Sequence, residues 1–244
     1  MRPSPTNAPD LWFKPSDLFS ALAAFLNAST SPDVSSGELF RYDLTDITRD
    51  SLQVLFSQLY VDMIKAYQAN DTSQVQKVGT QLIDLLADMD RLLGANERFL
   101  VGSWIDDAKS WGTDAGEKKL LEYNARVQIT LWGPDGEILD YAGKQWAGVV
   151  GGYYIPRWKF FTQWLIQLIQ KGKRFDSYIF GEHILSEVEV PWTMNQTIYP
   201  TEPSGDTVAI SHELFSKYKS LFRSSAVDNL YKMSMSNAEC RKEA

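Results

Sequence analysis

The sequence predicts an all-α fold, a bundle of about eight helices. Apolar residues recur at steps of three and four through most of the 244 residues, as on the buried face of a helix. Strand-like alternation is confined to one short stretch, residues 186–190. Turn signals made of Gly, Pro, Asn and Asp separate the periodic stretches. With 44% hydrophobic residues, the chain can bury a sizeable core.

The N-terminal part is expected to lead into the first helix. Residues 1–14 are rich in Pro and polar residues, which predicts a flexible segment. Ser16 is a candidate N-cap after Pro15, and Leu18, Leu22 and Phe25 follow at helical spacing. Residues 28–40 contain many Ser, Thr, Pro and Gly residues, which predicts a loop.

The strongest pattern predicts two long antiparallel helices. The first has apolar residues at Leu52, Leu55, Leu59 and Met63, and the chain breaks at Asn70-Asp71. The second has them at Val75, Val78, Leu82, Leu85, Met89 and Leu93, with Gly94 as its expected C-cap. Such a pair with a short link is a helical hairpin.

Further helices are expected over residues 99–111 and 115–132, with Gly112-Thr113-Asp114 between them. Another is predicted from about 137 to 153, interrupted by Pro156 and continued to Gly172. Residues 176–190 and 206–221 give two more. Residues 15–222 therefore form one helical domain, and 223–244 form a polar tail.

The composition argues against several classes of function. The net charge of −7 disfavours binding to nucleic acid or to an anionic membrane surface. No run of 18 apolar residues predicts a membrane span. The single cysteine, Cys240, forms no internal disulfide or thiolate metal cluster, and His183 and His212 each lack a second ligand at metal-binding spacing. No nucleotide-binding motif is present, so neither a metal nor another cofactor is predicted.

Three sequons are candidates for N-glycosylation, at Asn27, Asn70 and Asn195. The N-terminus has no apolar stretch of the kind that a signal peptide requires. Sequons without a signal peptide suggest that the chain is part of a longer protein.

No carboxylate pair has the arrangement of a hydrolase. A glycosidase holds two carboxyl groups roughly 5 to 9.5 Å apart on either side of a sugar. Glu137 and Asp140 are three residues apart on one predicted helix face, and Asp106 and Asp107 are adjacent. Both pairs are expected on a solvated helix surface, and no catalytic residue is predicted.

A possible binding site lies around the turn Pro134-Asp135-Gly136. On a helix over 137–153, the core stripe is Leu139, Ala142, Trp146, Val149 and Tyr153. Ile138 and Tyr141 lie together at its margin, just past the turn that follows Trp132. The three side chains suit a wall for a sugar ring, yet they equally suit the periphery of the core. The residues alone leave both interpretations open, and packing is the simpler one.

Longer blocks of sequence carry a resemblance. They are Arg41-Tyr42-Asp43-Leu44, Phe99-Leu100 with Gly102-Ser103-Trp104, Thr130-Leu131-Trp132-Gly133-Pro134, Ile138 to Ala142, Lys144-Gln145, Pro156-Arg157-Trp158, Tyr199-Pro200 and Gly205-Asp206-Thr207. Roughly residues 10–222 resemble the C-terminal helical domain of the α-N-acetylglucosaminidases, glycoside hydrolase family 89.

The resemblance implies a function. The resemblance is to the lysosomal enzymes of this family, which release terminal, non-reducing α-linked N-acetylglucosamine, notably from heparan sulfate, with two glutamates on a TIM barrel. The helical domain packs on that barrel and closes one side of the cleft, where the positions of Trp132, Ile138 and Tyr141 bind substrate. The expected partners are therefore the catalytic barrel and a terminal N-acetylglucosamine.

This chain contains neither the barrel nor its glutamates. Two possibilities remain open: the C-terminal part of a glycosidase, or a freestanding, non-catalytic helical module that binds sugar. The face that meets the barrel in the family should be an apolar patch here, so self-association into a homo-oligomer is possible.

Overall fold

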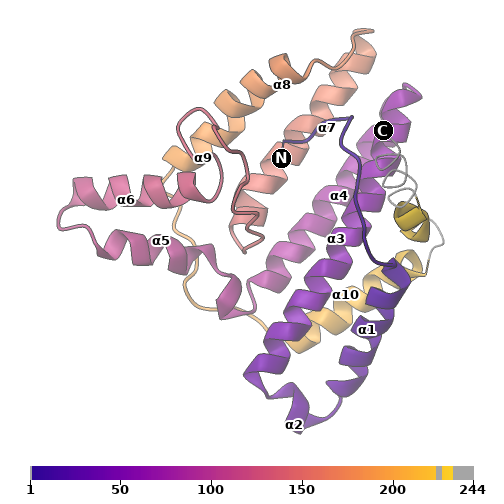
Figure 1. Cartoon of the computed structure of the whole chain (residues 1–244), viewed down its shortest axis with the longest axis vertical. Helices are drawn as coiled ribbons and strands as arrows, with labels where there is room; N and C mark the ends of the chain where they lie inside the picture. Colours follow the sequence, from indigo (N-terminus) through magenta and orange to yellow (C-terminus); the bar gives the residue numbers. More distant parts are fainter. Residues whose placement is uncertain (1, 224–226, 233–244) are drawn as a thin grey trace, which may run out of the picture.

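The computed structural model describes residues 2–223 and 227–232, and it is all-α (Figure 1). Within residues 2–223 there are ten α-helices: α1 (Pro15–Ala28), α2 (Pro32–Ser35), α3 (Glu38–Gln68), α4 (Thr72–Leu93), α5 (Val101–Ser110), α6 (Ala115–Gln128), α7 (Ile155–Gln170), α8 (Ser177–Ile184), α9 (Val190–Met194) and α10 (Thr207–Phe222). The predicted fold class is confirmed. The number exceeds eight because α2 and α9 are single short turns of helix.

The hairpin of α3 and α4 is the centre of the molecule. Asp71 begins α4 as its N-cap, with its carboxylate accepting a hydrogen bond from the amide of Gln74 at 2.9 Å. Asn70 makes the reversal in the left-handed conformation, at φ 56°. Gly94 is the C-cap of α4 as predicted, although with a right-handed φ of −64°. The apolar stripe of α4 is buried along its whole length.

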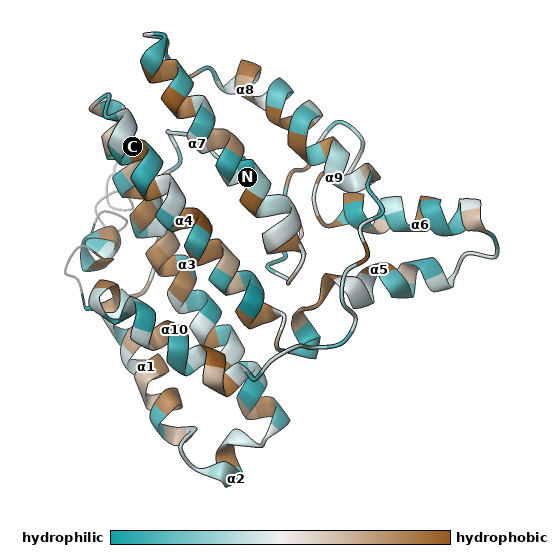
Figure 2. Cartoon of the chain, turned by 180° about the vertical axis from the view of Figure 1, so that it is seen from behind, coloured by the Kyte–Doolittle hydropathy of each residue, from teal (hydrophilic) through white to brown (hydrophobic). Residues whose placement is uncertain are grey.

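The other long helices pack on both sides of this hairpin (Figure 1). α1 and α10 contact α3, and α7 runs beside α4. Hydrophobic and hydrophilic residues are interleaved along most helices (Figure 2), which is typical of helices with one buried face. α7 ends at Gln170 with Lys171 as its C-cap, Gly172 follows with a φ of 61° that suits a glycine, and the amide of Lys173 bonds back to Leu168 O.

A second hairpin, α5 and α6, projects from this body (Figure 1). Its base rests on a separate core cluster formed by Val101, Ile105, Ile129, Val149, Tyr153 and Trp192. The indole of Trp104 donates a hydrogen bond across the hairpin to Ala125 O at 3.0 Å. The residues that follow α6 therefore start from a fixed position.

Two π-helical turns lie where the sequence places prolines. Val150–Tyr154 runs directly into α7, and Leu185–Glu189 runs into α9. Each turn ends two residues before a proline, Pro156 or Pro191. A proline ring clashes with the carbonyl four residues earlier, and the wider π turn relieves this clash. Pro156 therefore does not interrupt the helix, contrary to the prediction, and 186–190 is not a strand.

The predicted helix over 137–153 is the main error. Residues 129–148 form turns and extended backbone instead, with an isolated parallel bridge between Leu100 and Ala147. Left-handed backbone at Gly136, Asp140, Gly143 and Gly148 is incompatible with a right-handed helix. Of the expected core stripe, Val149 and Tyr153 are fully buried, whereas Leu139, Ala142 and Trp146 are half-buried.

Smaller differences occur towards the N-terminus. α1 begins at Pro15 with Lys14 as its N-cap, so Ser16 is inside the helix. The predicted loop 28–40 contains α2 and the start of α3.

The two end segments make specific contacts. Flexibility of residues 1–14 stays a prediction, but the Tyr60 hydroxyl shares its proton between the carbonyls of Ser4 and Asn7, at 2.6 and 2.8 Å. In the tail, residues 227–232 are helical, with Val227 and Leu230 buried in the main core. The rest of the tail, including Cys240, lies outside the described residues apart from Arg223.

Candidate functional site

The loop of residues 129–143 brings the three predicted site residues together. Its two ends are paired, because Asp140 N donates to Thr130 O at 2.7 Å and Ile138 N donates to Leu131 O at 3.4 Å. Trp132 N also bonds back to Val127 O at the end of α6. The loop is therefore closed on itself and anchored to α6.

Trp132, Ile138 and Tyr141 are all partly exposed on this loop. Their exposed fractions are 41%, 48% and 70%. The rings of Trp132 and Tyr141 contact each other, with centroids 5.2 Å apart and planes inclined at 54°. None of the three is enclosed by the chain, so their faces remain accessible to a ligand. Their grouping results from the folded loop and not from the helical phase that the sequence suggested.

Two residues of the loop have strained backbone. Trp132 has φ 56° and Asp140 has φ 55°. The left-handed region is unfavourable for a bulky side chain such as Trp, and Asp tolerates it better. Such strain persists only where surrounding contacts enforce it, and it concentrates at functional sites.

A buried chain of charges lies directly beneath the loop. Arg157 Nη1 donates to both carboxylate oxygens of Asp140 at 3.0 Å, and Arg157 Nε lies 2.9 Å from Glu189 Oε1. Glu189 in turn accepts from Arg2 at 2.7 Å. The side chains of Arg157, Glu189 and Asp140 are all buried. We call Arg2, Glu189, Arg157 and Asp140 the charge chain; its formal charges sum to zero.

The environment of Arg157 keeps its guanidinium ionised. Burial alone lowers the pKa of Arg157, but Tyr153, Asp140 and Glu189 act in the opposite sense, and the net shift is upward. The guanidinium also lies 4.8 Å from the ring centre of Tyr153. Burial raises the pKa of the Tyr153 hydroxyl, so this group stays neutral.

The sequence interpretation missed this chain. Asp140 was expected on a solvated helix surface with Glu137, but it is buried against Arg157 because the loop turns inward there. Glu137 is exposed, and its carboxylate accepts from Asp135 N at 3.3 Å. Asp106 and Asp107 are exposed as predicted. One sequence feature that could have indicated this charge chain is Arg157, a lone arginine within a run of aromatic residues.

The remaining candidates lie elsewhere. Asn27 and Asn70 are exposed, whereas Asn195 is half-buried and its side chain accepts from Thr197 N. Glycosylation of these residues stays a prediction. His183 pairs with Glu187 at 2.9 Å, and His212 lies 2.9 Å from Ser29 Oγ. Among residues 2–223 and 227–232, no three His, Cys, Asp or Glu side chains gather in a way that could hold a metal ion.

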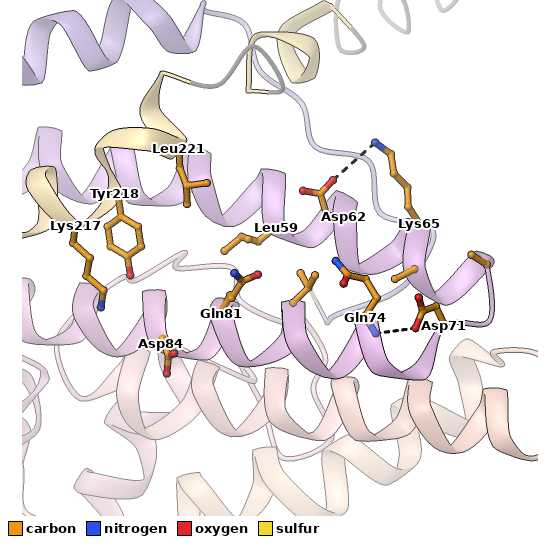
Figure 3. Close-up of a pocket in the computed structure, with 13 residues that line it drawn as sticks. Leu59, Asp62, Lys65, Asp71, Gln74, Gln81, Asp84, Lys217, Tyr218 and Leu221 are labelled. Atoms are coloured by element: carbon orange, nitrogen blue, oxygen red, sulfur yellow. Dashed lines mark hydrogen bonds and ion pairs between the residues drawn. The ribbon is translucent and has the colours of Figure 1, made fainter.

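Two cavities of the described residues lie away from the three residues or beside them. The cavity in Figure 3, about 640 Å³, lies between α3, α4 and α10, with Asp62, Lys65 and Lys217 at its edge. A smaller cavity of about 280 Å³ lies beside the loop and is lined by Asp140, Gly143 and Arg157 among others. Neither is lined by Trp132, Ile138 or Tyr141, which form a surface wall.

Comparisons with known proteins agree with this architecture. Residues 1–217 match the family described as "Alpha-N-acetylglucosaminidase (NAGLU) C-terminal domain". Human alpha-N-acetylglucosaminidase is 36% identical over 218 residues, which are 89% of this chain and 29% of the human protein. The chain thus spans less than a third of this relative.

Solved structures give the same fold. A family 89 glycoside hydrolase from Clostridium perfringens, in complex with 2-acetamido-1,2-dideoxynojirmycin, matches with a TM-score of 0.76 and 24% identity, covering 89% of this chain and 26% of that one. The same organism's enzyme in complex with its substrate GlcNAc-alpha-1,4-galactose matches with a TM-score of 0.74 and 24% identity, over 88% and 26% of the two chains.

No helix in the described part of the chain is both long and apolar enough to cross a membrane.

The family match covers most of the chain and is supported by the human relative and by the shared all-α fold. The chain therefore belongs to the family of alpha-N-acetylglucosaminidase C-terminal domains.

Proposed function

We propose that this chain forms one wall of the substrate cleft of an α-N-acetylglucosaminidase, with Trp132, Ile138 and Tyr141 in contact with a terminal, non-reducing α-linked N-acetylglucosamine. The observation that carries the proposal is the grouping of these three partly exposed side chains on one closed loop. Aromatic faces pack on the apolar face of a pyranose ring, and the Tyr141 hydroxyl adds a hydrogen-bonding group.

The chemistry would come from another domain. Retaining hydrolysis needs a nucleophile and a general acid on either side of the bond that breaks. In this chain Asp140 is engaged by Arg157, and Glu137 is a surface residue. The partner is therefore the catalytic barrel of the complete enzyme, and heparan sulfate in the lysosome is the proposed setting of the reaction.

Saturation-transfer NMR with methyl N-acetyl-α-D-glucosaminide tests the wall on the purified chain. A weak signal is expected, because one wall covers only one face of the sugar. Trp132→Ala should abolish it. Trp111→Ala is the matched control, since Trp111 is 83% exposed at the end of α5. If Trp132→Ala and Trp111→Ala lose the sugar's saturation-transfer signal equally, or if neither loses it, the proposed wall is contradicted.

A freestanding binding module would give the same NMR result. The two cases differ in the response to a family 89 catalytic barrel supplied separately. The proposed function predicts that the chain binds the barrel and that the complex hydrolyses the sugar. A chain that binds sugar but not the barrel would instead be a freestanding module.

A further inference from the structure

The wall is carried by a loop with little regular structure of its own. Between the end of α6 and the π turn at Val150, residues 129–148 form turns and extended backbone, and two of their backbone hydrogen bonds, donated by Ile138 N and Tyr141 N, are long at 3.4 Å. Segments without a helix or a sheet of their own open locally more readily than helices do, unless side chains hold them. The position of Trp132, Ile138 and Tyr141 therefore depends on what fixes the loop to the helices below.

One buried link of this kind is the contact between Asp140 and Arg157. Asp140 directly precedes Tyr141 and lies two residues after Ile138. Its backbone amide bonds to Thr130 O, and its carboxylate accepts two hydrogen bonds from Arg157 Nη1 at 3.0 Å. One residue thus ties the loop both to its own beginning and to the first turn of α7.

Arg157 is itself held from three directions. Its guanidinium lies against Tyr153, Glu189 and Asp140, and Glu189 is fixed by Arg2. A planar guanidinium can make these contacts at once, whereas a lysine ammonium cannot. The charge chain therefore offers the loop a rigid anchor in a region where a loose carboxylate would be costly to bury.

We propose that Arg157 is a positioning residue for the sugar-facing wall: it holds Asp140 in its left-handed conformation and thereby sets the places of Ile138, Tyr141 and Trp132. This inference rests on the proposed function, but the anchoring can be measured without any sugar. Arg157 does not touch the substrate in this arrangement. It acts through Asp140.

Hydrogen exchange of the loop amides tests the anchoring on the full chain. In Asp140→Ala and Arg157→Lys, exchange in residues 130–143 should become at least about tenfold faster, equal to about 1.4 kcal/mol of lost local stability. Amides in the middle of α4 should change much less. Asp140→Asn should lie between these variants and the wild type, because Asn tolerates left-handed backbone and keeps an acceptor for Arg157.

Arg126→Lys is the matched control. Arg126 is also fully buried, bonds the carboxylate of Glu122 and lies over Trp192, but its guanidinium reaches Thr197 O and not the loop. It should lower global stability without selectively loosening residues 130–143. If Asp140→Ala and Arg157→Lys loosen the loop no more than Arg126→Lys does, the proposal is wrong. If Arg157→Lys does not fold, exchange of residues 130–143 in the Asp140 variants is compared with that in Arg126→Lys by the same criterion.

The saturation-transfer signal of methyl N-acetyl-α-D-glucosaminide, measured on the same variants, distinguishes the anchoring by Arg157 from the proposed substrate wall. A loosened loop together with a weakened sugar signal supports both. A loosened loop with no sugar signal even in the wild type contradicts the proposed wall, while the anchoring itself stands. An unchanged loop with a Trp132-dependent sugar signal contradicts the positioning role alone.

Discussion

The rings of Trp132 and Tyr141 lie 5.2 Å apart and at 54° to each other, although nine positions separate these residues in the chain. The Tyr141 ring covers one side of the Trp132 ring, and Tyr141 is the more exposed of the two. The pair presents two inclined aromatic surfaces next to Ile138. Removing one ring should therefore affect the other.

Two substitutions at Tyr141 should have graded effects on sugar binding. Tyr141→Phe keeps the ring contact with Trp132 and loses one hydroxyl, worth roughly 0.5–1.5 kcal/mol, or about two- to tenfold in affinity. Tyr141→Ala also uncovers Trp132 and should weaken binding further. Titration with methyl N-acetyl-α-D-glucosaminide, followed by NMR, measures both. Equal affinities for the two variants would contradict a role for the ring.

The chain alone should not hydrolyse a fluorogenic α-N-acetylglucosaminide. The reaction needs two carboxyl groups on opposing walls of a cleft, and the wall proposed here supplies only binding surface. The purified chain is assayed before and after repurification. Activity that persists and disappears on mutation of a carboxylate within the 244 residues would reveal a missed active site.

Asp90 should make stability depend on pH. Burial raises its pKa, even though hydrogen bonds from Gly148 N and Gly151 N to its carboxylate act in the opposite sense. A carboxyl whose folded pKa lies above its unfolded value favours folding below the unfolded pKa, and this contribution is lost as pH rises through the folded pKa. Asp90→Asn keeps an acceptor for both amides without the charge. It should therefore stabilise the fold more at pH 7 than at pH 4.

Urea unfolding of the wild type and Asp90→Asn at both pH values gives the comparison. Asp90→Ala is the control, because it removes the acceptor and should destabilise the fold at both pH values. A difference between Asp90→Asn and the wild type that grows towards acid pH would refute the assignment.

Gly79 allows close contact between α4 and α7. A Cβ built at Gly79 would lie 2.4 Å from Thr162 Cγ2. Gly79→Ala should therefore destabilise by about 1–3 kcal/mol through overpacking, despite a gain of up to about 1 kcal/mol in helix propensity. Thr162→Ala in the same chain should restore most of the loss. A double-mutant cycle by thermal unfolding tests this, and additive effects would mean that the two residues do not clash.

The isolated chain should self-associate. Several large apolar side chains are strongly exposed: Trp111, Leu120, Met194 and Ile198. Water-exposed apolar surface of this kind favours association when no partner covers it. Light scattering over a range of concentrations measures the effect, and Trp111→Ser with Ile198→Ser should reduce it. A wild-type chain that stays monomeric at high concentration would rule this out.

Much of the helical body could be predicted because its signals are local. The stripe from Val75 to Leu93 and the Asp71 cap specify α4 without reference to the rest of the chain. The region after α6 could not be predicted in this way. An apolar pattern at helical spacing is present in 137–153, but the left-handed residues and the contact of Asp140 with Arg157 prevent a helix there.

The sequence by itself determined the all-α class and the α3–α4 hairpin, and its resemblance to a known family singled out Trp132, Ile138 and Tyr141 as a group. Periodicity, caps and turn residues act over a few positions, so one chain suffices to read them. Only the tertiary structure decided how that group is held. Asp140 and Arg157 are 17 residues apart and Arg2 is far from both, so the charge chain exists only once burial makes pairing of these groups necessary.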